Sequence, residues 1–166
     1  MATYSIKKTK MNNFSLFSHP KRECKKLTFE PILNSKGGIS MDDYINEIRR
    51  NTKEAEKFFA EKLAFTLGPV ELNEMMKKDG VKLIDVRYSD DFAESHIPKA
   101  ISIPKHELQL KLPTLSKHDI HVVYCYNQQC HLGASAALFL AKNDYPVMEL
   151  EGGFKVWKHD FKLEVT

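Results

Sequence analysis

The sequence is poor in cysteine and contains no long apolar run. Only three cysteines, Cys24, Cys125 and Cys130, occur among its 166 residues, too few and too unevenly spaced for the disulfide framework of a small secreted protein. No apolar stretch approaches the ~20 residues that a membrane-spanning helix requires, and the N-terminal residues lack the uninterrupted apolar core of a secretory signal. These absences argue against a disulfide-stapled or membrane-spanning protein, and we expect a cytoplasmic location, where thiols stay reduced.

Positive charge is concentrated at one end of the chain. Residues 1–30 contain seven Lys or Arg and two Glu, a net charge of +5, whereas the whole chain carries +3, so residues 31–166 carry −2. A basic segment of this kind can contact nucleic acid or acidic lipid, or can belong to an organellar targeting peptide. Because residues 1–38 also lack hydrophobic periodicity, we expect a solvated, mobile N-terminal arm, with neither a nucleic-acid partner nor a membrane contact.

A long amphipathic helix is predicted over residues 39–65. Its apolar positions recur at helical spacing: Met41, Tyr44, Ile45, Ile48, Ala55, Phe59 and Leu63. An apolar stripe of this length is normally covered. Packing on the following domain is the favoured expectation, and self-association or a protein partner through residues 41–64 is the alternative.

Residues 66–166 alternate between short apolar segments and helical ones. Strands are predicted at VKLIDV (81–86), ISI (101–103), IHVVYC (120–125) and VMEL (147–150), and helices at 69–76, 90–95, 106–111, 131–143 and from Phe154 onward. Strands that are apolar without strict alternation are typical of a parallel sheet with helices on both faces. We therefore expect an α/β domain over residues 66–166, with its ligand site beyond the carboxyl ends of the strands.

Cys125 is the last residue of a predicted strand, where such a site is expected. The loop that follows is rich in hydrogen-bonding groups: Tyr126, Asn127, Gln128, Gln129, Cys130 and His131. Backbone N–H groups of this loop and the N-terminus of the next helix can converge on the sulfur, which would lower the pKa of the thiol. Cys125 is thus the expected nucleophile, and residues 126–131 the expected substrate-binding loop around an anionic sulfur.

Two segments of the sequence resemble the signature of rhodanese domains. LIDVRYSDDFAESHIPKAISIP (83–104) is similar to the first half of that signature, and VVYCYNQQCHLGASAALFLAKNDYPVMELEGGFKVW (122–157) to the second. The resemblance covers about residues 66–160 and implies a rhodanese-like parallel sheet. It implies a sulfurtransferase in which Cys125 accepts sulfane sulfur as a persulfide from a donor and passes it to a thiol or another nucleophilic acceptor, with no cofactor and no metal ion. Asp85 and Arg87 match the family's buried aspartate and the adjacent arginine, which are expected to support the site structurally.

The loop departs from the common pattern of single-domain rhodaneses. It is longer, and residues 122–141 contain no Lys or Arg. An anionic donor such as thiosulfate would therefore meet no side-chain cation, which favours a persulfide donor. Related phosphatases use Cys-x5-Arg, and the corresponding residue here is His131, which cannot form the planar two-point clamp on a phosphoryl group.

Cys130 has three interpretations: a small buried residue at the helix start, a resolving thiol that attacks a modified Cys125, or a metal ligand together with Cys125 and His131. The metal site is disfavoured because the spacing matches no common zinc pattern. Two alternatives to a sulfurtransferase remain open. One is a non-catalytic rhodanese-like binding or regulatory module that uses residues 41–64, and the other is a redox sensor that uses Cys125 and Cys130.

Overall fold

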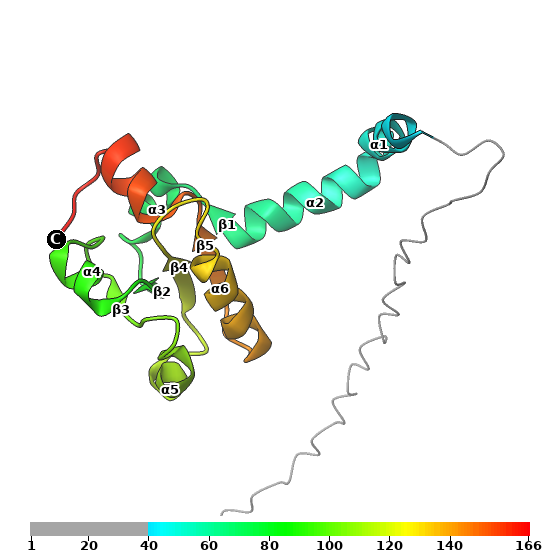
Figure 1. Ribbon diagram of the computed structural model, residues 1–166. Coiled ribbons are helices and arrows are strands. Elements are labelled where there is room, and N and C mark those ends of the chain that lie inside the picture. Colours follow the sequence, from blue (N-terminus) through cyan, green and yellow to red (C-terminus); the bar gives the residue numbers. More distant parts are fainter. Residues whose placement is uncertain (1–39) are drawn as a thin grey trace, which may run out of the picture. The chain divides into compact units, whose positions relative to one another are not determined.

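A five-stranded parallel sheet organises the protein, in a computed structural model that describes residues 40–166 (Figure 1). The strand order is β1-β5-β4-β2-β3. The strands are β1 (Thr66–Leu67), β2 (Val81–Asp85), β3 (Ile101–Ser102), β4 (Ile120–Tyr124) and β5 (Val147–Leu150), and every neighbouring pair is parallel. The predicted sheet is thus confirmed. The expected arm at residues 1–38, with Cys24, lies outside the described residues.

Short helices connect the strands, close to their predicted boundaries. They are α3 (Pro69–Met75), α4 (Ser89–Glu94), α5 (Leu108–Lys111), α6 (Leu132–Lys142) and α7 (Gly153–Lys155), with a 3-10 turn at Leu112–Thr114 and a π-helical turn at Val156–Asp160. At α3, Pro69 occupies the first helical position, and the Gly68 N–H donates to the Glu71 carboxylate at 3.2 Å.

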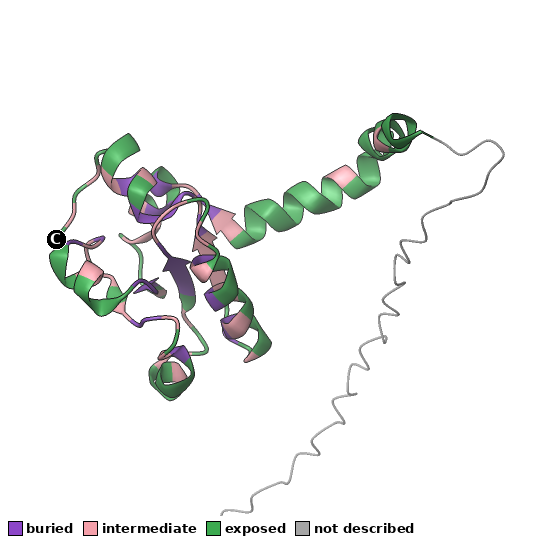
Figure 2. Cartoon of the chain, viewed as in Figure 1, coloured by how far each residue is buried: buried purple, intermediate pink, exposed green. Residues whose placement is uncertain are grey.

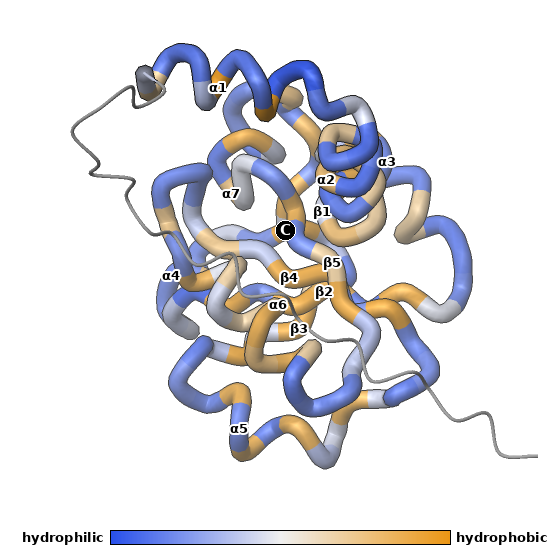
Figure 3. Tube along the Cα trace, turned by 90° about the vertical axis from the view of Figure 1, so that its right-hand side faces the viewer, coloured by the Kyte–Doolittle hydropathy of each residue, from blue (hydrophilic) through white to orange (hydrophobic). Residues whose placement is uncertain are grey.

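Helices cover both faces of the sheet because neighbouring strand residues point to opposite sides. One face carries Leu83, Val122 and Tyr124, which pack with Leu72 of α3 and with Phe154 and Trp157 near the C-terminus. The opposite face carries Ile84, Val123 and Cys125, which pack with Leu108 of α5 and with Ala136 and Leu140 of α6. Figure 2 shows this core as the purple residues at the sheet, and Figure 3 shows the apolar colour concentrated in the strands. The helices on both faces, expected from the sequence, are therefore present.

The prediction of a single helix over residues 39–65 is wrong, because Asn51 divides this segment into two helices. α1 spans Met41–Arg50 and α2 spans Thr52–Phe65. The Asn51 side chain accepts a hydrogen bond from the Glu54 N–H at 3.2 Å, and its ψ of 86° leaves the helical region. Asparagine favours this N-terminal cap over a helix interior because its side chain replaces a missing backbone acceptor.

Most of the apolar stripe on α1 and α2 is exposed rather than packed on the following domain (Figure 2). The exposed fractions are 67% for Met41, 40% for Tyr44, 47% for Ile48, 58% for Phe59 and 77% for Leu63. The favoured expectation of packing on the domain is therefore wrong for these five side chains. Near β1, an ion pair between Lys62 and Glu151 at 3.2 Å joins the end of α2 to the residue that follows β5. Self-association or a protein partner through residues 41–64 stays a prediction.

Candidate active site

Cys125 directly follows β4, at the edge of the sheet where the parallel strands end. The residue is only 3% exposed. The thiol donates a hydrogen bond to the Cys130 carbonyl oxygen at 3.1 Å, and the Asn127 carbonyl oxygen lies 3.8 Å from Sγ. The loop after β4 thus curls back over the sulfur.

The environment of Cys125 favours the neutral thiol. Burial raises the pKa of the Cys125 thiol to about 11, and a hydrogen bond with the Cys130 side chain adds to this effect. The backbone N–H groups of Gly133 and Asn127 act in the opposite direction. The expectation of a lowered thiol pKa is therefore wrong for the resting protein, because loss of hydration outweighs the backbone dipoles.

This raised pKa predicts how alkylation of Cys125 depends on pH. Only the thiolate reacts with iodoacetamide, so the rate at Cys125 should rise about tenfold for each pH unit between about pH 6 and pH 9. The rate is measured on the peptide that contains Cys125, by mass spectrometry of acid-quenched samples. The peptide that contains Cys130 serves as an internal comparison. A plateau of the Cys125 rate near neutral pH would contradict the burial of this thiol.

A cavity of about 310 Å³ opens beside Cys125. Five of the seven residues expected at the site line this cavity: Cys125, Asn127, Gln128, Cys130 and His131. The remaining lining residues were not predicted and are Thr66, Ala134, Glu149, Leu150, Glu151 and Gly152. Among the described residues that line the cavity, none is Lys or Arg. His131 lines it at the position that corresponds to the phosphatase arginine.

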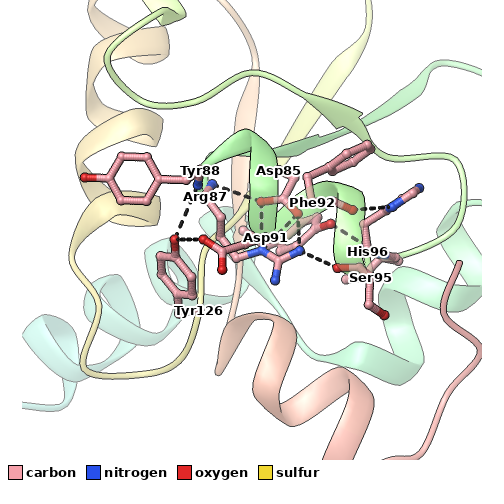
Figure 4. Close-up of polar contacts among 10 residues, drawn as sticks. Asp85, Arg87, Tyr88, Asp91, Phe92, Ser95, His96 and Tyr126 are labelled. Atoms are coloured by element: carbon pink, nitrogen blue, oxygen red, sulfur yellow. Dashed lines mark hydrogen bonds and ion pairs between the residues drawn. The ribbon is translucent and has the colours of Figure 1, made fainter.

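Tyr126 and Gln129 lie in the loop but do not line the cavity. The Tyr126 hydroxyl donates to the Asp91 carboxylate at 2.6 Å and accepts from the Tyr88 N–H at 3.3 Å (Figure 4). Gln129 is exposed, and its N–H donates to the Asn127 side-chain oxygen at 3.0 Å. Both residues therefore hold the shape of the loop.

The carboxylates of Glu149 and Glu151, at the end of β5, also line the cavity. Glu149 is half-buried, and burial raises the pKa of its carboxyl group, although a hydrogen bond from the Ala134 N–H opposes this rise. Because β5 lies beside β4, with Val123 opposite Glu149, the carboxyl ends of both strands meet at the same edge. The sequence signal that could have identified them is the pair of glutamates in MELEGG (148–153), at the end of a predicted strand.

Asp85 and Arg87 form a buried ion pair on the neighbouring strand end (Figure 4). The shortest contact joins Arg87 Nη2 to Asp85 Oδ2 at 2.6 Å, and Nη2 also donates to the Ser95 carbonyl oxygen at 2.8 Å. The guanidinium carbon lies 4.1 Å from the ring centroid of Phe154, whose N–H donates to the Cys125 carbonyl oxygen at 2.8 Å. The pair therefore contacts a residue that holds the backbone of Cys125, and its expected role in supporting the site stays a prediction.

Gly153 allows the turn after β5 to approach Cys125 closely. Its φ is +60°, and a Cβ at this position would lie 2.5 Å from the Cys125 carbonyl oxygen. We expect Gly153→Ala to lower the free energy of unfolding by more than the ~1–2 kcal/mol cost of left-handed backbone alone, because a backbone atom blocks the methyl group. Urea unfolding measures this loss.

A matched control is Gly68→Ala, since nothing lies within 4 Å of a Cβ built there. Gly68 precedes α3, where alanine costs about 1 kcal/mol or less relative to glycine. Equal losses in the two variants would show that the approach to Cys125 is not tight.

Residues 40–166 contain neither a metal-binding cluster nor a membrane-spanning helix. No group of three or more His, Cys, Asp or Glu in this range is arranged to hold a metal ion. None of the helices described there has both the length and the apolar character of a membrane span.

Comparison with known proteins identifies the fold family. The family model of the Rhodanese-like domain matches residues 68–160. The chain is similar to the thiosulfate sulfurtransferase GlpE of Stutzerimonas stutzeri, with 29% identity over 98 residues, which is 58% of this chain and 88% of the relative. It is also similar to the thiosulfate sulfurtransferase GlpE of Coxiella burnetii, with 33% identity over 51% of this chain and 78% of the relative. Among solved structures, the BH2092 protein from Bacillus halodurans superposes with a TM-score of 0.65 and 31% identity, covering 70% of this chain and 86% of that chain. Since the family match spans more than half of the sequence and agrees with the parallel sheet, the chain belongs to the rhodanese-like domain family.

Proposed function

We propose that the protein is a sulfurtransferase that carries sulfane sulfur as a persulfide on Cys125. The observation that carries the proposal is the position of Cys125, which directly follows the central parallel strand β4, is buried, and still lines a cavity. Relatives named as thiosulfate sulfurtransferases support the same reaction class.

Loading transfers one sulfur atom between two thiols. The Cys125 thiol gives up its proton, and the thiolate attacks the sulfane sulfur of a donor persulfide. A bond forms between Sγ and that sulfur while the S–S bond of the donor breaks. The donor keeps the electron pair and leaves as a thiol after taking up the proton that Cys125 released. The sulfane sulfur then sits about 2 Å beyond Sγ. An acceptor thiolate reverses the sequence, so that Cys125 recovers its electron pair and proton.

The backbone around Cys125 supports the loaded form. The backbone N–H groups of Asn127 and of Gly133, which lies in the first turn of α6, act to lower the pKa at Sγ. Such N–H groups stabilise negative charge. A persulfide is a stronger acid than its parent thiol, so the loaded residue benefits more from these donors than the resting thiol does.

The donor that we propose is a persulfide rather than thiosulfate. Among the described residues, the cavity lining contains two glutamates and no Lys or Arg. A doubly charged anion would therefore enter without a side-chain cation to pair with it, and such pairs are the strong contacts in anion recognition.

The experiment that tests the proposal is intact-protein mass spectrometry after treatment with a low-molecular-weight persulfide and, separately, with thiosulfate. We expect a gain of one sulfur atom from the persulfide, reversed by cyanide or by an added thiol. No gain from either reagent would overturn the sulfurtransferase and leave the non-catalytic binding module as the better hypothesis.

A further inference from the structure

The Glu149 carboxylate lies near the Cys125 thiol, and the proposed reaction does not itself require a carboxylate there. A Cβ built on Gly133 would lie 2.5 Å from Glu149 Oε1 and 3.5 Å from Cys125 Sγ. The carboxylate and the thiol thus face the same small gap above Gly133, and both residues line the cavity. A group that approaches Cys125 through this gap passes beside the Glu149 carboxylate.

The Glu149 carboxylate also interacts with a backbone N–H group at the start of α6, that of Ala134. The backbone N–H of Ala134 opposes the rise of the pKa of this carboxyl group. This N–H belongs to the first turn of an 11-residue helix, where an anion is stabilised by the helix dipole. The Glu149 carboxylate therefore lies where the helix dipole stabilises negative charge.

Of the two glutamates that line the cavity, Glu149 contributes the main negative charge near Cys125. Glu151 also lines the cavity, but its carboxylate pairs with the Lys62 ammonium group at 3.2 Å. His131 contributes an attractive charge to Glu149 only in its protonated form. The gap above Gly133 is consequently suited to a cation.

We propose that Glu149 is a specificity-determining residue of sulfur transfer, which selects thiols that carry an ammonium group close to their sulfur. This inference rests on the proposed function. In a 2-aminothiol such as cysteamine, two carbon atoms separate the sulfur from the nitrogen, so the ammonium group can reach the carboxylate while the sulfur attacks the sulfane atom on Cys125. An acceptor with a carboxylate in that position meets like charge instead.

The transfer step balances without another reactant. The acceptor thiolate forms a bond to the sulfane sulfur, and the bond between that sulfur and Cys125 Sγ breaks. The electron pair stays on Sγ, the acceptor becomes a persulfide, and the proton of the acceptor thiol ends on Cys125.

Single-turnover transfer to three small thiols tests this role. Full-length protein loaded with one sulfur is mixed with cysteamine, 2-mercaptoethanol or thioglycolate, which carry a positive, a neutral and a negative group. The loss of one sulfur from Cys125 is followed by intact mass. Each variant's rate is divided by the wild-type rate with the same thiol, so that the intrinsic reactivity of the thiols cancels.

We expect Glu149→Gln to shift the preference for cysteamine over thioglycolate by about tenfold toward thioglycolate, the size of one charge-assisted contact. Glutamine keeps the size of the side chain and an oxygen acceptor for the Ala134 N–H. Glu151→Gln should shift the preference less, because Lys62 already pairs with that carboxylate. Glu61→Gln, an equal change of charge at an exposed position on α2, should leave it unchanged.

The possible results separate this inference from the proposed function. A uniform change of all three rates in Glu149→Gln would give Glu149 a structural role only and would overturn the specificity. An unchanged preference would overturn it as well. If the wild-type protein gains no sulfur at all, the proposed function fails first, and the specificity of the transfer fails with it.

Discussion

Replacement of Cys125 by serine should abolish sulfur transfer. A hydroxyl oxygen cannot form a persulfide, so Cys125→Ser should lower the rate by more than about a thousandfold, to the uncatalysed background. The measurement is the rate at which a persulfide donor transfers sulfur to cyanide or a thiol, with intact mass as a second readout. Serine is close to cysteine in size, and the buried position should keep its packing, which a thermal melt of the variant checks.

Cys130→Ser is the matched control for this prediction. Cys130 lines the same cavity and contacts Cys125 through its carbonyl oxygen, which the substitution retains. We expect Cys130→Ser to keep most of the transfer activity. An equal loss in the two variants would instead show a dithiol reaction, in which Cys130 attacks the persulfide or another oxidised form of Cys125. This outcome would favour the redox-sensor alternative.

Removing one partner of the buried Asp85–Arg87 pair should cost about 3–5 kcal/mol of the free energy of unfolding. The side chains are 0% and 4% exposed, so Arg87→Met leaves the Asp85 carboxylate buried without its main partner. It also removes the donor to the Ser95 carbonyl oxygen and the contact with Phe154. Urea unfolding measures the loss, and the midpoint of thermal unfolding should fall by about 10 °C.

A double-variant cycle separates the pair from general loss of packing. The combination of Asp85→Asn with Arg87→Met should be less destabilised than the sum of the single variants, because neither charge is then left alone. Arg49→Met is the matched control, since Arg49 is exposed on α1 and, within residues 40–166, its side chain makes only a 3.4 Å hydrogen bond to Asn46. A loss below about 1 kcal/mol in Arg87→Met would contradict the importance of the buried pair.

The parts of the fold that could be predicted depend on local patterns. Apolar β-branched runs identify β2 and β4, and the end of β4 identifies Cys125. β1 is missed because a strand of two residues has no pattern of its own and exists only through its pairing with β5. The break at Asn51 is missed because the apolar spacing continues across it, while the cap depends on one side-chain hydrogen bond.

The sequence predicts Cys125 and most of the loop residues that line the cavity, but not the two glutamates that give the cavity its charge. Glu149 reaches Cys125 because β5 is placed beside β4, and the order of strands cannot be obtained from the spacing of residues. The raised pKa of the Cys125 thiol has a similar origin. It depends mainly on how completely Cys125 is buried, and the sequence of the loop does not show the extent of that burial.

The pairing of the first strand with the last has a consequence for the order in which the chain folds. Thr66 lies opposite Glu149, so this edge of the sheet joins residues that are far apart in sequence. Such a contact forms late, because a long loop must be closed before the pairing stabilises it. A nascent chain that ends before residue 147 has no partner strand for β1 and no carboxylate beside Cys125. The Glu149 carboxylate can therefore take its place near the Cys125 thiol only after synthesis has passed β5.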